Sequence, residues 1–303
     1  MRDAMLKILW QLVRGYPIGV CIYLLCLSNS LASVDVCEQP PDYSHVSVAY
    51  YKHGKSAFAR GIGQTNQENH NFDLLLKLNE SWAFGLGHRY DILGVDPIEL
   101  QTNGHLHTLF FPLHKQNESD SKSFRFSIAP ALSASSNIMK DPGEYSADAF
   151  RVLAALVWSR NLSDRVTIRY GVCGDNRFGS YEIYPSISIG WRLHSDWTID
   201  LGFPTTRLTY QGSRKINSSL RITPNGNEWH VKNKSMEKQS QLVYEASLLE
   251  WVVNWQAHEH FTITASIGRQ FHNRYDLTLL DDSQTRLSSA SVTRIGAGLA
   301  WRF

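Results

Sequence analysis

Residues 181–193 read YEIYPSISIGWRL, and their side chains alternate in character. The odd-numbered positions are apolar or aromatic and include Ile183, Ile187 and Trp191, whereas most even-numbered positions from Glu182 to Arg192 are polar, small or charged. Successive side chains of a β-strand point to opposite sides of the sheet. The stretch therefore predicts one strand with an apolar face and a polar face.

The same period of two recurs along the chain. Residues 124–133, 165–172 and 261–268 each carry apolar side chains at alternate positions, with Arg, Ser, Thr, Gly or Ala between them. Further alternating segments begin near His45, Asn69, Trp82, His105, Ala147, Trp197, Thr206, Ile216 and Gln241. So many short strands joined by turns predict an all-β protein.

The composition of the two faces indicates which solvent each one meets. A soluble sandwich turns a charged face outward, but here the polar face is rich in Gly, Ser, Thr and Arg. Tryptophans cluster near the proposed short turns, as in the aromatic girdles of membrane barrels. They are Trp82, Trp158, Trp191, Trp197, Trp251, Trp255 and Trp301. Because hydrocarbon does not tolerate open sheet edges, the strands are expected to close into a transmembrane antiparallel up-and-down β-barrel.

Turn lengths support this interpretation. Tight polar turns are expected at 79–81, 161–163, 194–196 and 257–259, and longer connections lie between them. Short turns on the periplasmic side and long loops outside are typical of outer-membrane barrels. The strand number is then even. We predict 14 strands, with 12 as the alternative if residues 204–234 form a hairpin in a loop, and a β-bulge near Leu248 and Leu249, where the alternation slips.

The first 32 residues have the form of a secretory signal. Arg2, Lys7 and Arg14 precede an apolar stretch at 16–27, and cleavage is expected between Ala32 and Ser33. A membrane anchor is the alternative. The predicted organisation is a signal peptide at 1–32, a periplasmic N-terminal segment at 33–43 and an outer-membrane barrel at 44–303.

Charge and cysteine content exclude other classes of protein. Without residues 1–32 the chain keeps 27 basic and 27 acidic residues, so no nucleic-acid partner is expected. Cys37 and Cys173 are then the remaining cysteines. We expect them not to pair, because Cys37 precedes the first strand on the periplasmic side and Cys173 ends an outward-running strand.

The inward face is predicted to be rich in charge. Its candidate lumen residues are Arg125, Arg151, Arg165, Arg169, Glu182, Arg192, Asp200, Arg207, Glu245 and Arg294, with Asp73, Arg221 and Arg302 beside them. These side chains either form a network of ion pairs that fills a narrow barrel or line a watery passage that favours anionic or polar solutes.

The predicted function is therefore a passive channel or binding barrel for small polar or anionic solutes in the outer membrane of a Gram-negative bacterium. The alternative is a non-conducting structural or adhesive barrel on the cell surface. An outer-membrane hydrolase is less favoured, because His45 and Ser47 form the single His-x-Ser pair and no suitable Asn follows. We expect no enzyme activity and no cofactor. No metal site is expected either, since His105 and His107 lack an identifiable third ligand.

The carboxyl-terminal strand has the most specific pattern. Ile295, Ala297, Leu299, Trp301 and Phe303 alternate with small or basic residues, and Phe303 is the final residue. This end resembles the assembly signal of Gram-negative outer-membrane β-barrel proteins, with Trp301 and Phe303 as its aromatic residues. The resemblance implies outer-membrane lipid, the barrel-assembly machinery and periplasmic chaperones as partners.

A second resemblance lies at residues 185–204, which read PSISIGWRLHSDWTIDLGFP. This segment is similar to an uncharacterised family of such barrels, known as a domain of unknown function. The similarity implies location and fold, and it brings no catalytic residues to this chain.

Deleting Phe303 should impair assembly of the barrel while export continues. The reason is that the assembly machinery is expected to bind the strand that ends in this residue. Membrane fractions probed for heat-modifiable migration would measure assembly, and normal levels of the truncated protein there would contradict the assignment.

Overall fold

The computed structural model describes residues 36–303 except 60–62, 97–103, 120, 234–237 and 280–283. The expected signal peptide and its cleavage point at Ala32 and Ser33 lie outside the described residues. The strands are β1 (His45–His53), β2 (Ser56–Ala57), β3 (Gln64–Lys77), β4 (Trp82–Asp96), β5 (His105–Phe110), β6 (Leu113–Ser119), β7 (Lys122–Ser135), β8 (Phe150–Ser163), β9 (Val166–Asp175), β10 (Glu182–Arg192), β11 (Trp197–Phe203), β12 (Thr206–Gln211), β13 (Ile216–Pro224), β14 (Asn227–Asn233), β15 (Lys238–His258), β16 (Phe261–Leu279), β17 (Gln284–Ser289) and β18 (Val292–Arg302).

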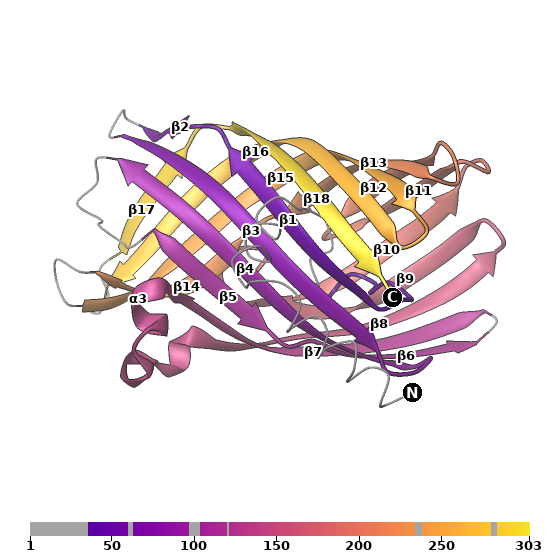
Figure 1. Cartoon of the computed structure of the whole chain (residues 1–303), viewed down its shortest axis with the longest axis horizontal. Coiled ribbons are helices and arrows are strands. Elements are labelled where there is room, and N and C mark those ends of the chain that lie inside the picture. Colours follow the sequence, from indigo (N-terminus) through magenta and orange to yellow (C-terminus); the bar gives the residue numbers. More distant parts are fainter. Residues whose placement is uncertain (1–35, 60–62, 97–103, 120, 234–237, 280–283) are drawn as a thin grey trace, which may run out of the picture.

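These elements occupy 14 antiparallel positions in one closed barrel (Figure 1). Four positions are filled by two successive elements that pair with the same neighbour: β1 and β2 with β3, β5 and β6 with β7, β13 and β14 with β15, and β17 and β18 with β16. Pairing of β1 with β18 closes the barrel. The predicted all-β barrel of 14 strands is confirmed. Residues 204–234 contribute wall strands, as this count requires.

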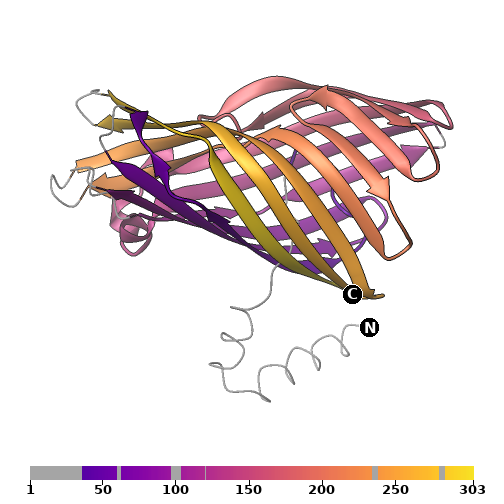
Figure 2. The same ribbon diagram turned by 90° about the horizontal axis from the view of Figure 1, so that it is seen from above.

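The two ends of the barrel differ in their connections. At the turn end, His45 of β1 pairs with Arg302 of β18, and the strands are joined by short turns. The opposite end, called here the loop end, carries the longer connections and the short helices α3 (Ser136–Met139), η2 (Pro142–Glu144) and η3 (Ala147–Ala149). Figures 1 and 2 show these two ends in views at right angles. Among the described residues, no helix has the length and apolar character that a membrane crossing requires.

Strand lengths vary strongly around the wall. β9 to β12 have 10, 11, 7 and 6 residues, whereas β15 and β16 have 21 and 19. A tilted membrane strand needs about 9–11 residues, so the long strands extend beyond the short ones at the loop end. There the wall is narrowed by a parallel bridge between His230 of β14 and Ala134 of β7. We call this loop-end part of the barrel, around Leu93, Leu106, Trp229, Leu242 and Tyr275, the extension.

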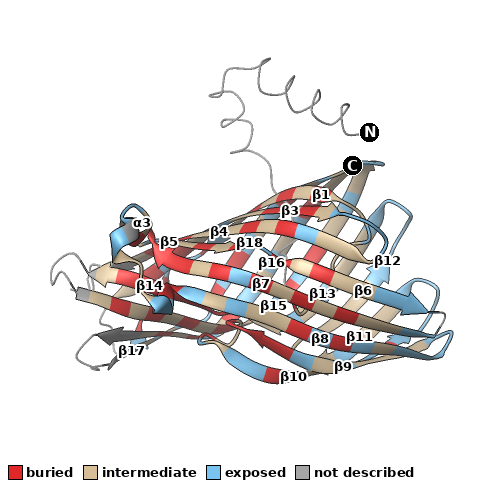
Figure 3. Cartoon of the chain, turned by 90° about the horizontal axis from the view of Figure 1, so that it is seen from below, coloured by how far each residue is buried: buried red, intermediate tan, exposed pale blue. Residues whose placement is uncertain are grey.

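Between the extension and the turn end, the outer surface of the wall is apolar. On β10, Ile187 is 54% exposed, and Ile189 and Trp191 are exposed beside it, while the alternate residues Tyr184 and Gly190 are buried. Figure 3 shows this alternation of burial along the strands. The exposed large residues form a surface that we call the apolar belt. Its members include Val152, Trp158, Tyr170, Ile187, Trp191, Leu201, Leu220, Trp251, Trp255, Ile267, Ile295 and Trp301.

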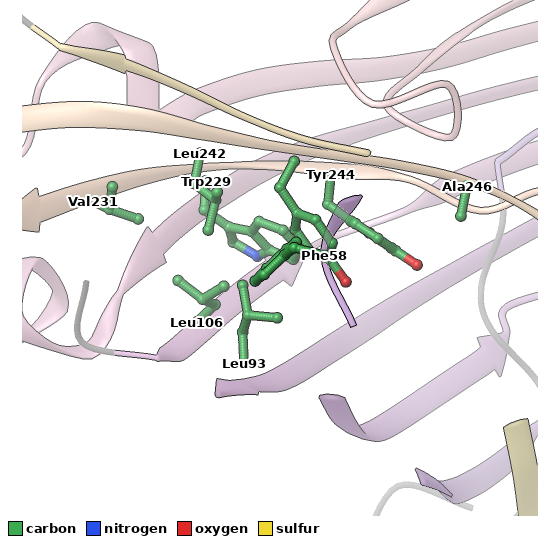
Figure 4. Packing of buried hydrophobic residues seen from close by; sticks show 9 residues of the cluster. Phe58, Leu93, Leu106, Trp229, Val231, Leu242, Tyr244 and Ala246 are labelled. Carbon is green, nitrogen blue, oxygen red and sulfur yellow. The ribbon is translucent and has the colours of Figure 1, made fainter. Parts of the chain in front are cut away.

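In the extension the polarity is reversed. Its interior is filled by an apolar cluster of Phe58, Leu93, Leu106, Trp229, Val231, Leu242, Tyr244, Ala246 and Tyr275 (Figure 4). On its outer surface the Arg274 guanidinium lies 3.5 Å from the Glu245 carboxylate and 3.1 Å from that of Asp276. Apolar side chains therefore point inward where the outer surface is charged, and outward in the apolar belt.

This reversal explains why the apolar–polar alternation of the sequence slips at Leu248 and Leu249. Leu242, Tyr244, Ala246 and Leu248 are all buried in the interior, and the even-numbered positions of β15 continue to face inward at the buried Glu250. The predicted bulge at Leu248 and Leu249 was therefore wrong. Even-numbered side chains continue to point inward through these residues. What changes is which side is apolar: the inner side before them and the outer side after them. The register shifts of β15 against β16 lie instead between Glu245 and Ser247 and between Gln256 and His258.

Two valines on the outer face of β15 test this assignment. Val253→Arg places a charge in the apolar belt and should lower the free energy of unfolding in lipid vesicles by about 2–4 kcal/mol, as for charges near the bilayer midplane. Val243→Arg lies in the extension, opposite Asp276, and should change it little. Equal losses in a denaturant titration of the two variants would show that the reversal does not mark a change of solvent.

Candidate functional site

The interior of the barrel contains a cavity of about 350 Å³. Strands from distant parts of the chain line it, with Tyr51 on β1, Asp73 on β3, Arg89 on β4, Arg221 on β13 and Arg294 on β18. Each of these positions lies on the inward-facing side of its strand, so the strand period directs these groups toward the lumen. The cavity is thus lined by charged, polar and apolar side chains together.

The segment before β1 enters this space. Val36 is buried, and residues 38–41 line the cavity. The guanidinium of Arg125 on β7 donates hydrogen bonds to the backbone carbonyls of Cys37, at 2.7 Å, and of Glu38. Residues 36–41, which the sequence places in the periplasm, therefore lie within the barrel. We call them the inner segment.

Glu38 connects the inner segment to the opposite wall. Its carboxylate accepts a hydrogen bond of 2.9 Å from Arg207 on β12. Burial raises the pKa of the Glu38 carboxyl, but the positive charges of Arg207, Arg221 and Arg177 outweigh this effect and lower the pKa to about 2. The carboxylate consequently stays ionised at any pH near neutrality.

Ion pairs extend around the interior wall. Their closest N–O distances are 2.6 Å for Arg221–Glu250, 2.6 Å for Arg169–Asp200, 2.8 Å for Arg177–Asp175, 3.0 Å for Arg151–Glu228 and 3.0 Å for Arg89–Asp91. Glu250 is wholly buried and also lies 3.9 Å from Arg294, whose guanidinium stacks 3.7 Å above the Tyr51 ring. Buried charges are costly unless paired. The interior is therefore a neutralised network around a small cavity.

Six of the predicted lumen residues lie on this interior face. Arg125 and Arg207 contact the inner segment, Arg151 and Arg294 pair with wall carboxylates, and Arg169 and Asp200 pair with each other.

The other four predicted residues are placed differently. Arg165 is exposed in the turn between β8 and β9, because β9 begins one residue later. Glu182 and Arg192 are exposed at the two ends of β10, beyond the enclosed part of the lumen. Glu245 lies on the outer surface of the extension and pairs with Arg274, because the apolar side of β15 is the inner one there.

Several interior residues were not predicted from the sequence. Glu250 lies between two outward-facing residues, Leu249 and Trp251, so the alternation alone would have placed it inside. Glu38 and Arg177 gave no such signal, because neither lies in a strand. Their places follow from contacts between distant parts of the chain.

The residues considered for hydrolysis and for a disulfide are also inside the barrel. His45 and Ser47 are buried, and the Ser47 hydroxyl has no hydrogen-bond partner within the described part of the chain. The pair thus lacks the Ser–His hydrogen bond that hydrolysis would need. Cys37 packs against the cluster that contains Cys173 and Tyr184, and both cysteines remain thiols. The premise that topology separates them was wrong, because the inner segment enters the barrel.

Several solved structures resemble the chain in fold. The COG4313 outer membrane channel from Pseudomonas putida F1 is 10% identical, with 90% of this chain and 100% of that chain covered and a TM-score of 0.47. The P. putida toluene transporter TodX is 10% identical, with 87% and 91% covered and a TM-score of 0.44. The NanC porin is 8% identical, with 85% and 100% covered and a TM-score of 0.42. At these values no function transfers to this chain.

No curated protein matches the chain. A family model described as "Domain of unknown function (DUF6268)" matches residues 122–281. This range includes residues 185–204, where the sequence resembles an uncharacterised barrel family. Because the match spans more than half of the chain, the protein belongs to the DUF6268 family.

Proposed function

We propose that the protein is an outer-membrane β-barrel of a Gram-negative bacterium whose lumen binds and admits small polar or anionic solutes. The observation that carries the proposal is the contrast between the two sides of one wall. Arginines and carboxylates surround a cavity of about 350 Å³ inside, while large apolar residues cover the outside. Such a wall suits hydrocarbon on one side and a charged or polar solute on the other.

The proposed orientation follows the connections. The short turns, the start of β1 and the end of β18 would face the periplasm. The loop end, with its water-facing extension, would lie outside the cell. The barrel-assembly machinery and chaperones are the partners proposed for insertion, with Trp301 and Phe303 as the assembly signal. Both aromatic side chains are exposed at the turn end, where they are available for such contacts.

The filled interior favours a binding barrel over a permanently open pore. The apolar cluster fills the extension at the loop end, and the inner segment occupies part of the lumen beside the cavity. A solute that crosses must therefore bind in the cavity and pass both the cluster and the inner segment. The cluster also supports the alternative function, a non-conducting surface barrel, because a packed extension is a rigid platform for loops.

Two tryptophan variants separate these functions. Trp229→Ala removes a buried ring from the apolar cluster and should raise the single-channel conductance in planar bilayers severalfold over the small steps of the wild type. Trp251→Ala, on the apolar belt, is the matched control and should leave the conductance unchanged. Folding of each variant is verified by heat-modifiable migration. Silent but folded barrels in all three proteins would contradict the channel and favour the surface barrel.

A further inference from the structure

Arg207 differs from its neighbours in the origin of its partner. Arg151, Arg169 and Arg221 each contact a carboxylate supplied by another wall strand. The carboxylate that Arg207 contacts belongs instead to Glu38 of the inner segment. The charge of one arginine in the barrel wall is thus neutralised by a carboxylate from a segment that lies outside the sheet.

The inner segment holds this carboxylate in a fixed position. Arg125 binds two successive carbonyls of its backbone, and the preceding residue, Val36, is buried. Besides the contact with Arg207, Arg221 and Arg177 act electrostatically on Glu38. One guanidinium thus contacts the carboxylate, and two more, each paired with another carboxylate, add positive charge around it. Guanidiniums are the groups with which proteins commonly recognise carboxylates.

The position of Glu38 is open to the cavity. Its side chain is 36% exposed and that of Arg207 33%, and Glu38, Arg177 and Arg221 line the cavity of about 350 Å³. That volume lies at the lower end of the range for small-molecule sites. A small carboxylate-bearing molecule in the cavity would lie near Arg177 and Arg221, and beside the Glu38 carboxylate that Arg207 binds.

We propose that Arg207, with Arg177 and Arg221, forms a carboxylate-binding site in the lumen, and that Glu38 occupies it as an internal competitor. The proposal rests on the proposed function and narrows its solutes to small carboxylates. A carboxylate that enters replaces Glu38 at Arg207, so Arg207 keeps an anionic partner throughout the exchange, and the displaced Glu38 carboxylate turns toward the cavity. Neutral solutes of the same size gain nothing from this exchange, and the site therefore discriminates by charge.

Calorimetric titration of the detergent-purified mature chain with succinate tests the proposal. Glu38→Gln removes the competing charge at constant shape and should bind succinate about tenfold more tightly than the wild type, because the ligand no longer displaces a carboxylate. Glu38→Ala should behave similarly. The double variant Glu38→Gln with Arg207→Gln should lose the gain. Succinamide, the neutral isostere, should bind none of these proteins measurably.

The controls make each outcome informative. Glu259→Gln removes one negative charge from an exposed turn and should titrate as the wild type does. Equal succinate affinity in wild type and both Glu38 variants, or equal binding of succinamide, would overturn the proposal even if the barrel conducts. Tighter binding by Glu38→Gln in a barrel that stays silent in bilayers would uphold the carboxylate site and reject the channel. Heat-modifiable migration confirms that each variant is folded before titration.

Discussion

Every other feature of the molecule depends on the pairing of β1 with β18. Peptide groups that face hydrocarbon have no water to bond, so each strand edge must find a partner. Residues from His45 to His53 pair in continuous register with residues from Arg302 back to Arg294, which leaves the sheet without a first or last edge. Closure then separates two environments. The period-2 alternation of one chain supplies an apolar surface to one of them and a polar surface to the other.

In the extension the two faces of the same wall are exchanged: apolar side chains face inward and charged side chains face outward. Alternation is not a property of strands alone, since it records which solvent lies on each side. Along β15 the buried residues change from Leu242 and Tyr244 to Glu250 without any change in direction of the side chains. A charged outer surface around an apolar cluster is the arrangement of a soluble protein. One continuous strand therefore combines a soluble section with a membrane section, and the boundary falls between Leu248 and Leu249.

This explains how far the sequence could lead. The alternation and the turn lengths are local signals, and they were sufficient for the all-β class, the closed barrel and the 14 strands. Glu245 was misplaced because a polar residue on a strand was assumed to face inward everywhere, and that holds only within the apolar belt. The inner segment could not be found by any local pattern. Its position comes from contacts of Glu38 and Cys37 with strands that lie more than 80 residues away in sequence.

Charge neutrality within the lumen links the fold to the proposed transport. An enclosed arginine is tolerated when a carboxylate accompanies it, so the wall supplies Glu228, Asp200 and Glu250 to its own arginines. Both partners of each of these pairs lie on strands of the wall, whose backbones the sheet holds in place. The pair of Arg207 with Glu38 is different, because one partner is carried by a segment outside the sheet. An exchange of anions inside a closed barrel requires one ion pair that can be replaced while the wall stays intact, and this pair meets the requirement.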